Sequence, residues 1–252
     1  MRTDLSANEA GVTGEAGAVA LQTPSIYTDG TYLAGHGSWH QEDSPWKAKH
    51  IEAMLERNGI AFETLCEVGC GAGEILSVLA RSYPGKRLCG YEISPQAFAL
   101  CRGKERDGLT FKLGDLLAES GESYDVLLAI DVFEHVEDYL GFLKTLKGKA
   151  AYKVFHIPLD LSVQSVLRMR PILKLRNEVG HLHYFTKETA LATLRYAGYE
   201  VVDAVFTGTA VDLPNRGWKA DLMRLPRRAL YALSPDWAAR LFGGYSLMVL
   251  AK

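Results

Sequence analysis

Three glycines at alternate positions, Gly69, Gly71 and Gly73, follow a short apolar run that contains the acid Glu67. A helical pattern begins directly after them. Such a turn lets a ligand lie against bare backbone, because glycine has no side chain to block the approach and accepts positive φ. Glu74 stands where a dinucleotide-binding turn needs its third glycine. A carboxylate there disfavours a pyrophosphate and favours a ligand with a cationic end.

Further polar residues follow predicted strands. The segment 86–93 is typical of a strand and carries Glu92 near its end, where an acid can accept hydrogen bonds from both hydroxyls of a ribose. Ser94 and Pro95 then provide the N-cap and first position of a helix. The pattern predicts further strands over 109–113, 124–130, 151–157, 199–206 and 245–251, and a helix over 186–198. Because open α/β sheets bind ligands at the carboxyl ends of their strands, the polar residues should share one rim.

Taken as a set, the motifs from residue 65 to residue 132 resemble those of the class I S-adenosylmethionine-dependent methyltransferases. The resemblance implies an α/β fold with a Rossmann-like doubly wound sheet, mostly parallel but with an antiparallel last strand. It also implies S-adenosylmethionine as the cofactor. By that resemblance, the methionine part would be held by Glu67, Gly69, Gly71 and Gly73 and the ribose by Glu92, with Ile93 also at the cofactor. Asp115 and Leu116 would border the adenine, and Asp131 and Val132 would line the floor near the methyl group.

Four histidines are candidates for work on the methyl acceptor. Methyl transfer to a hydroxyl requires an oriented acceptor and removal of its proton, and histidine titrates in a suitable range. His135 follows the fourth predicted strand, where we expect it to open a helix, and His156 lies on the fifth strand. We predict that one of these two is the base. His181 and His183 precede the late helix and are predicted to bind the acceptor. For each histidine taken alone, a packing or capping role is the alternative.

A metal site is the competing use of these histidines, together with Asp131, Glu134 and Asp160. The sequence contains no tight ligand spacing such as HExxH. It also lacks the Asp-Asn pair that marks the metal-dependent catechol-type methyltransferases. We therefore predict no bound metal.

Three segments are expected to surround the acceptor. Residues 25–60 should form an N-terminal lid, carrying Tyr27, Trp39 and His40, and a helix that starts at Ser44. In the resembling family, residues ahead of the first strand often cover the cofactor and exclude water. Residues 161–182 and 208–243 are predicted to be cap insertions. Their excess of Lys and Arg indicates either solvated helix faces or a pocket for an anionic acceptor.

The composition is that of one soluble globular domain. The 252 residues are 48% hydrophobic and 23% charged, with a formal net charge of −2. Residues 1–24 have no apolar periodicity and are predicted to be a disordered tail, which leaves 25–252 as a single methyltransferase domain. No apolar run reaches the ~18–20 residues of a membrane span, and the N-terminus lacks a secretory pattern. The four cysteines form no CxxC pair, so we expect reduced thiols and a cytoplasmic protein.

The acceptor is expected to be a small molecule. Enzymes that methylate base amines or protein glutamine carry an Asn/Asp-Pro-Pro-aromatic motif after the fourth strand, whereas residues 131–134 here read Asp-Val-Phe-Glu. A Pro-Cys nucleophile and a nucleic-acid module are absent from the sequence. We therefore predict O-methylation of a sugar, glycan precursor or secondary metabolite by a monomer or homodimer. The alternatives are N-methylation of an amine or amino sugar, a non-catalytic nucleotide-binding regulator, and an NAD-dependent oxidoreductase, which Glu74 disfavours.

Overall fold

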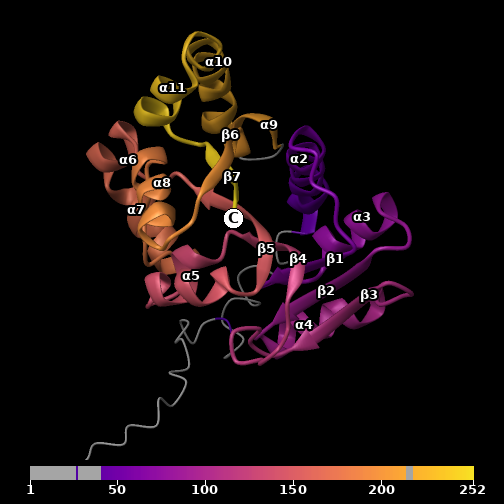
Figure 1. The fold of residues 1–252 in the computed structure, drawn as a ribbon. Coiled ribbons are helices and arrows are strands. Elements are labelled where there is room, and N and C mark those ends of the chain that lie inside the picture. The colour runs from indigo at the N-terminus through magenta and orange to yellow at the C-terminus, as the bar shows by residue number, and fades with distance from the viewer. Residues whose placement is uncertain (1–26, 28–40, 214–217) are drawn as a thin grey trace, which may run out of the picture.

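The computed structural model describes residue 27, residues 41–213 and residues 218–252. Within this part, one sheet of seven strands has the order β3-β2-β1-β4-β5-β7-β6 (Figure 1). The strands are β1 (Thr64–Val68), β2 (Arg87–Glu92), β3 (Leu109–Leu113), β4 (Tyr124–Ile130), β5 (Ala150–Pro158), β6 (Val201–Thr207) and β7 (Ser246–Ala251). The predicted tail at 1–24 and the predicted lid residues Trp39 and His40 lie outside the described residues.

The strand pairings confirm the predicted fold class. Strands β1 to β5 pair in parallel, and β7 enters antiparallel between β5 and β6. The bounds of β3 and β4 are those predicted from the sequence, and β2, β5, β6 and β7 differ by one or two residues at an end. The strand order reverses between β1 and β4. In open α/β sheets such a reversal leaves a crevice at the carboxyl ends of the strands, where ligands bind.

Helices cover both faces of the sheet. One face packs against α2 (Ser44–Arg57), α3 (Glu74–Ser82) and α4 (Pro95–Cys101). The other packs against α5 (Tyr139–Lys147), α8 (Lys187–Tyr196) and α11 (Pro235–Phe242). Because successive side chains of a strand point to opposite faces, Leu127 and Leu128 of β4 belong to different core clusters. These two cores fix the strand ends that carry the site.

Both predicted cap insertions are helical. Between β5 and α8 the chain forms α6 (Val163–Arg168), α7 (Arg170–Lys174) and a π-helix (Leu175–Val179), and between β6 and β7 it forms α9 (Thr209–Asp212), α10 (Trp218–Leu233) and α11. Since α11 contacts both α10 and α6, the two insertions meet. They gather at the β6–β7 end of the sheet, away from α3 and α4 (Figure 1). None of the helices in the described ranges combines the length and hydropathy needed to cross a membrane.

Local signals set the helix starts near the site. The Ser94 hydroxyl accepts a hydrogen bond from the backbone of Ala97 and caps α4, as the sequence predicts. The expectation that His135 opens a helix is wrong. His135 instead ends a one-turn 3-10 helix, Phe133–His135, and α5 begins only at Tyr139, where the side chain of Asp138 accepts from the Gly141 backbone. The four cysteines are buried and unpaired, as expected.

Candidate functional site

The turn between β1 and α3 has the backbone that its glycines predict. Gly69, Gly71 and Gly73 have φ of 66°, 56° and 75°, values that side chains strain to reach. Gly69 and Gly71 line a cavity. Gly73 does not: a Cβ atom there would lie 2.6 Å from the ring of Phe111, so this glycine lets α3 approach β3. Gly73 thus has a packing role in this structure, and its contact with the cofactor stays a prediction.

Glu92 ends β2 and braces the same turn. Its two carboxylate oxygens accept hydrogen bonds of 2.8 Å from the backbone nitrogens of Gly71 and Ser94. Burial raises the pKa of Glu92 to about 7, although these backbone donors favour the charged form. Glu92 and Ile93 both line the cavity, with lone pairs of the carboxylate left for a ligand.

Glu67, at the end of β1, is a buried acid without a full set of partners. The residue is 2% exposed, and its Oε2 atom has no hydrogen-bond partner in the described part of the chain. Burial raises the pKa of its carboxyl well above the usual range, while Lys47 opposes that shift. Because buried polar atoms are rarely left unpaired, Oε2 marks a place where a ligand donor fits.

Asp131 follows β4 and joins two other elements. Its carboxylate lies 2.7 Å from Lys47 Nζ on α2 and 2.6 Å from His156 Nδ1 on β5. Burial opposes ionisation, but His156 and Lys47 hold the pKa of Asp131 well below its usual range. The other ring nitrogen of His156 lies 2.8 Å from the Thr207 hydroxyl. With both nitrogens engaged and 1% exposure, His156 orients Asp131 and has no free atom for an acceptor.

His135 and His181 lie against each other in the lining of the cavity. The Nδ1 atom of His135 lies 2.8 Å from the Tyr27 hydroxyl and 3.1 Å from the Gly180 carbonyl. The Nδ1 atom of His181 lies 2.7 Å from a carboxylate oxygen of Asp160. The two imidazole rings contact each other edge to face, with centroids 4.8 Å apart. Burial and the neighbouring His181 lower the pKa of His135 to about 3.

Glu134 lies beside His135 and His181. From the sequence it had no role except as an alternative metal ligand. Its backbone carbonyl accepts hydrogen bonds from the nitrogens of Leu182 and His183, which fastens the segment before α8 to the turn after β4. Burial raises the pKa of its carboxyl well above the usual range. Glu134 and His135 are adjacent in the sequence, and this backbone docking helps to bring His181 to them.

One cavity of about 470 Å³ connects these groups. Its lining includes the glycine turn, Asp131 and Val132, and residues of the two cap insertions. The predicted site residues that it includes are Tyr27, Glu67, Gly69, Gly71, Glu92, Ile93, Asp131, Val132, His135, His156 and His181.

Three other predicted site residues lie elsewhere. The carboxylate of Asp115 accepts from the Leu117 backbone, and Leu116 is fully buried in the core, so neither reaches the cavity. His183 points away from it, with Nε2 2.9 Å from the Val136 carbonyl. Their predicted roles at the adenine and the acceptor remain predictions. Leu116 packs in the core cluster on the α5 side of the sheet, and the ring of His183 lies against Tyr139 of α5. The sequence pattern does not specify these contacts.

Acidic residues outnumber Lys and Arg in the lining of the cavity, where Lys47 of α2 is one of the bases. Of the basic residues in the two cap insertions, only Arg227 lines it among those that the structure describes. Arg240 instead pairs with Glu188, and Lys174 with Glu178. The acids in the lining are Asp43, Glu67, Glu74, Glu92, Asp131 and Asp160. The excess of Lys and Arg in the cap insertions had two interpretations, solvated helix faces or a pocket for an anionic acceptor. These charges give little support to the second.

Comparison with known proteins identifies the family. Residues 38–204, more than half of the chain, match the family described as "Methyltransferase domain". A ubiquinone biosynthesis O-methyltransferase of Xanthomonas euvesicatoria pv. vesicatoria (strain 85-10) is 26% identical over 186 residues, which cover 66% of this chain and 77% of that protein. Another, of Cereibacter sphaeroides (strain ATCC 17029 / ATH 2.4.9), is 33% identical over 100 residues, or 38% of each chain.

Solved structures share the fold. Magnesium protoporphyrin IX methyltransferase from Synechocystis PCC 6803, with bound SAH, has a TM-score of 0.55 at 18% identity and covers 86% of this chain and 83% of its own. A SAM-dependent methyltransferase from Thiobacillus denitrificans, in complex with S-adenosyl-L-homocysteine, has a TM-score of 0.55 at 17% identity and covers 88% and 96%. At such identities the likeness concerns the fold.

The glycine-turn end of the cavity fits S-adenosylmethionine. The unpaired Oε2 of Glu67 suits an ammonium donor, the side-chain-free Gly69 and Gly71 leave room against the backbone, and Glu92 can accept from a ribose. When bound, S-adenosylmethionine supplies a methyl group on a sulfonium, and the acidic lining favours that positive charge. Family, fold and lining residues agree: the chain belongs to the methyltransferase domain family and is an S-adenosylmethionine-dependent methyltransferase.

Proposed function

We propose that this enzyme methylates a hydroxyl oxygen of a small molecule, in the class of sugars, glycan precursors or secondary metabolites. The observation that carries the proposal is that one cavity is lined by the glycine turn, Asp131, His135 and His181 together. The acceptor end therefore presents imidazoles. An amine acceptor would call for an available carboxylate beside the methyl group, and Asp131 is already paired with Lys47 and His156. The O-methyltransferase names of the curated relatives also support oxygen as the methylated atom.

Proton removal falls, in this proposal, to the pair of histidines at the acceptor end. The sequence favoured His135 or His156, but the contacts of His156 suit an orienting role. His181 has a better arrangement, because Asp160 holds its Nδ1–H and leaves the Nε2 lone pair for a hydroxyl proton. His135 and Tyr27 lie beside it and would orient the acceptor.

The test is methyl transfer itself. The purified full-length enzyme is incubated with methyl-labelled S-adenosylmethionine and separate pools of hydroxyl compounds and amines, and products are identified by mass spectrometry and NMR. The proposal expects labelled methyl ethers. Transfer of the labelled methyl group to amines alone would overturn the proposal that a hydroxyl oxygen is methylated. Binding of S-adenosylmethionine, measured against NAD by calorimetry, confirms that the preparation is competent.

A further inference from the structure

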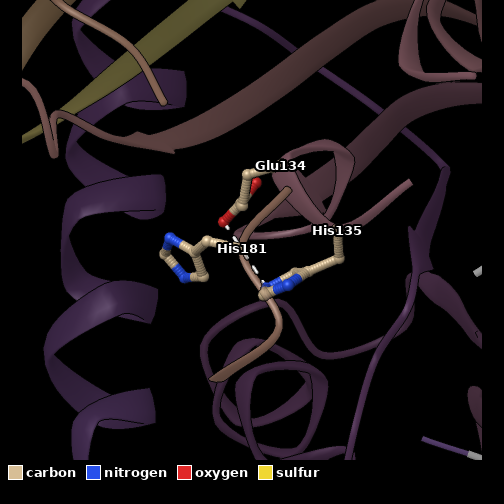
Figure 2. A group of neighbouring side chains, drawn as sticks. All are labelled: Glu134, His135 and His181. Atoms are coloured by element: carbon tan, nitrogen blue, oxygen red, sulfur yellow. Dashed lines mark ion pairs between the residues drawn. The ribbon is translucent and has the colours of Figure 1, made fainter. Parts of the chain in front are cut away.

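Glu134 carries two carboxylate oxygens that no hydrogen bond explains. The residue is 1% exposed, and neither oxygen has a partner in the described part of the chain. A buried carboxylate normally accepts several hydrogen bonds or binds a cation. Its Oε1 atom lies 3.8 Å from His135 Nε2, and one ring nitrogen of His181 completes a group whose ligand atoms all lie within 4.8 Å of one another (Figure 2).

The hydrogen bonds of His135 and His181 leave the lone pair of each Nε2 atom available for a metal ion. The Gly180 carbonyl beside Nδ1 of His135 can only accept, so Nδ1 carries the hydrogen and Nε2 carries the lone pair. The carboxylate of Asp160 fixes the same tautomer in His181. A carboxylate or carbonyl behind each imidazole is the arrangement that orients histidine ligands in metal sites.

The backbone holds the three side chains in place independently of any ion. The Glu134 carbonyl accepts from the nitrogens of Leu182 and His183, and the nitrogen of His181 donates to the Leu175 carbonyl. The ligand atoms are thus carried by two segments that are already docked. Ligand atoms about 2 Å from one ion would lie nearer together than those seen, so the Glu134 carboxylate would have to turn slightly toward the imidazoles.

We propose that Glu134, His135 and His181 bind a divalent first-row transition-metal ion through the carboxylate and the two Nε2 atoms. Two imidazoles and one carboxylate are the ligand set of open zinc and iron sites in enzymes. Since His135 and His181 line the cavity, the remaining coordination positions face the acceptor. We predicted no metal from the sequence because close ligand spacing is absent. In the structure the third ligand, His181, comes from a segment distant in the sequence.

The chemical consequence rests on the proposed function. A hydroxyl oxygen bound to a divalent ion loses its proton at lower pH than in water. The site therefore favours acceptors whose hydroxyl, alone or with a neighbouring oxygen, can ligate a metal. When the ion is bound, the lone pair of His181 is coordinated, and the ion replaces the imidazole as the group that promotes ionisation.

The test uses metal binding and does not depend on turnover. Full-length protein is stripped with a chelator, dialysed and titrated with Zn²⁺ in a calorimeter, and with Co²⁺ in a spectrophotometer. We expect one Zn²⁺ per chain and Co²⁺ ligand-field bands of a low-coordinate site. Glu134→Gln, which keeps the shape of the side chain, should weaken Zn²⁺ binding at least about tenfold, since it removes the charged ligand. The control His183→Gln, in the same segment, should bind Zn²⁺ as the wild type does.

Two results would overturn the metal site. The first is a wild-type protein that takes up no Zn²⁺ and shows no Co²⁺ bands; the second is Zn²⁺ binding that Glu134→Gln leaves unchanged. S-adenosylmethionine binding is measured on the same samples. Stripped protein that binds S-adenosylmethionine but no Zn²⁺ rejects the metal site and leaves the proposed function intact.

Discussion

The Nδ1 atom of His156 lies 2.6 Å from the carboxylate of Asp131, a non-glycine residue with a φ of 54°. This pairing joins β5 to the turn after β4, and Lys47 adds α2 to the same carboxylate. The backbone of a non-glycine residue is strained at positive φ, and this conformation persists only where neighbouring groups hold it. The pair therefore fixes the floor of the cavity, and its energetics can be measured.

Lys47→Met should lower the free energy of unfolding by about 1–3 kcal/mol, because it leaves a partly buried carboxylate with one partner fewer. Urea denaturation measures the change. Lys86→Met is the matched control, since Lys86 pairs with the exposed Glu63 and such surface pairs contribute about 0–1 kcal/mol. Equal losses in the two variants would show that Asp131 does not depend on Lys47.

Lowering the pH should weaken the same network of Asp131, His156 and Lys47 and so lower the free energy of unfolding. The folded-state pKa of Asp131 is depressed, so its contribution to stability is present above the pKa of the unfolded chain, about 3.9, and is lost as pH falls below it. We expect the unfolding free energy of Asp131→Asn to fall less steeply than that of the wild type between pH 5 and pH 3. Asparagine suits this position because it tolerates positive φ. Parallel curves would assign the acid sensitivity to other carboxylates.

Affinity for S-adenosylmethionine should rise with pH through neutrality. Glu92 has a pKa of about 7 in the folded protein, and a ribose diol is gripped best by the ionised carboxylate. Calorimetry should therefore give binding roughly tenfold tighter at pH 8 than at pH 6 if only the ionised form binds. Glu92→Gln should bind more weakly and without that pH dependence. If Glu92→Gln kept the pH profile of the wild type, Glu92 would not be the group that binds the ribose.

Gly73→Ala should destabilise the fold by packing as well as by strain. Its Cβ would lie 2.6 Å from the Phe111 ring, whereas Gly59, with a φ of 62°, has nothing within 4 Å. Gly59→Ala thus isolates the backbone cost, about 1 kcal/mol, and Gly73→Ala should exceed it by about 1–3 kcal/mol. Combining Gly73→Ala with Phe111→Leu should recover part of that excess. Strict additivity in denaturation measurements would mean that the contact is relieved elsewhere.

His181→Ala should lower the turnover number by about 10²–10⁴, the usual contribution of a positioned base, while S-adenosylmethionine binding stays near normal. Residual activity should rise with pH as hydroxide or the ionised acceptor replaces the lost group. His156→Ala should instead lower the free energy of unfolding, because it removes a partner of Asp131. Turnover lost in His156→Ala but kept in His181→Ala would return the role of base to His156.

Much of this protein is determined by its sequence alone. The apolar runs of β3 and β4 give the observed strand bounds, and the glycine turn with Glu92 predicts the ligand rim. These features follow from local physics: the direction of side chains along a strand and the φ that glycine allows. Residues at strand ends of a parallel sheet meet on one edge whatever their neighbours are.

Only the tertiary structure decides what the side chains at that edge contact. Gly73 lies against Phe111, and the ring nitrogens of His156 contact Asp131 and Thr207. The sequence predicts neither set of contacts. His181 lies 46 positions after His135 and 47 after Glu134, and the chain between them includes β5 and a helical insertion. Such groupings depend on how insertions dock, which is fixed by long-range backbone hydrogen bonds and core packing. No spacing along the chain encodes them, because a loop can close over many lengths at nearly the same free energy.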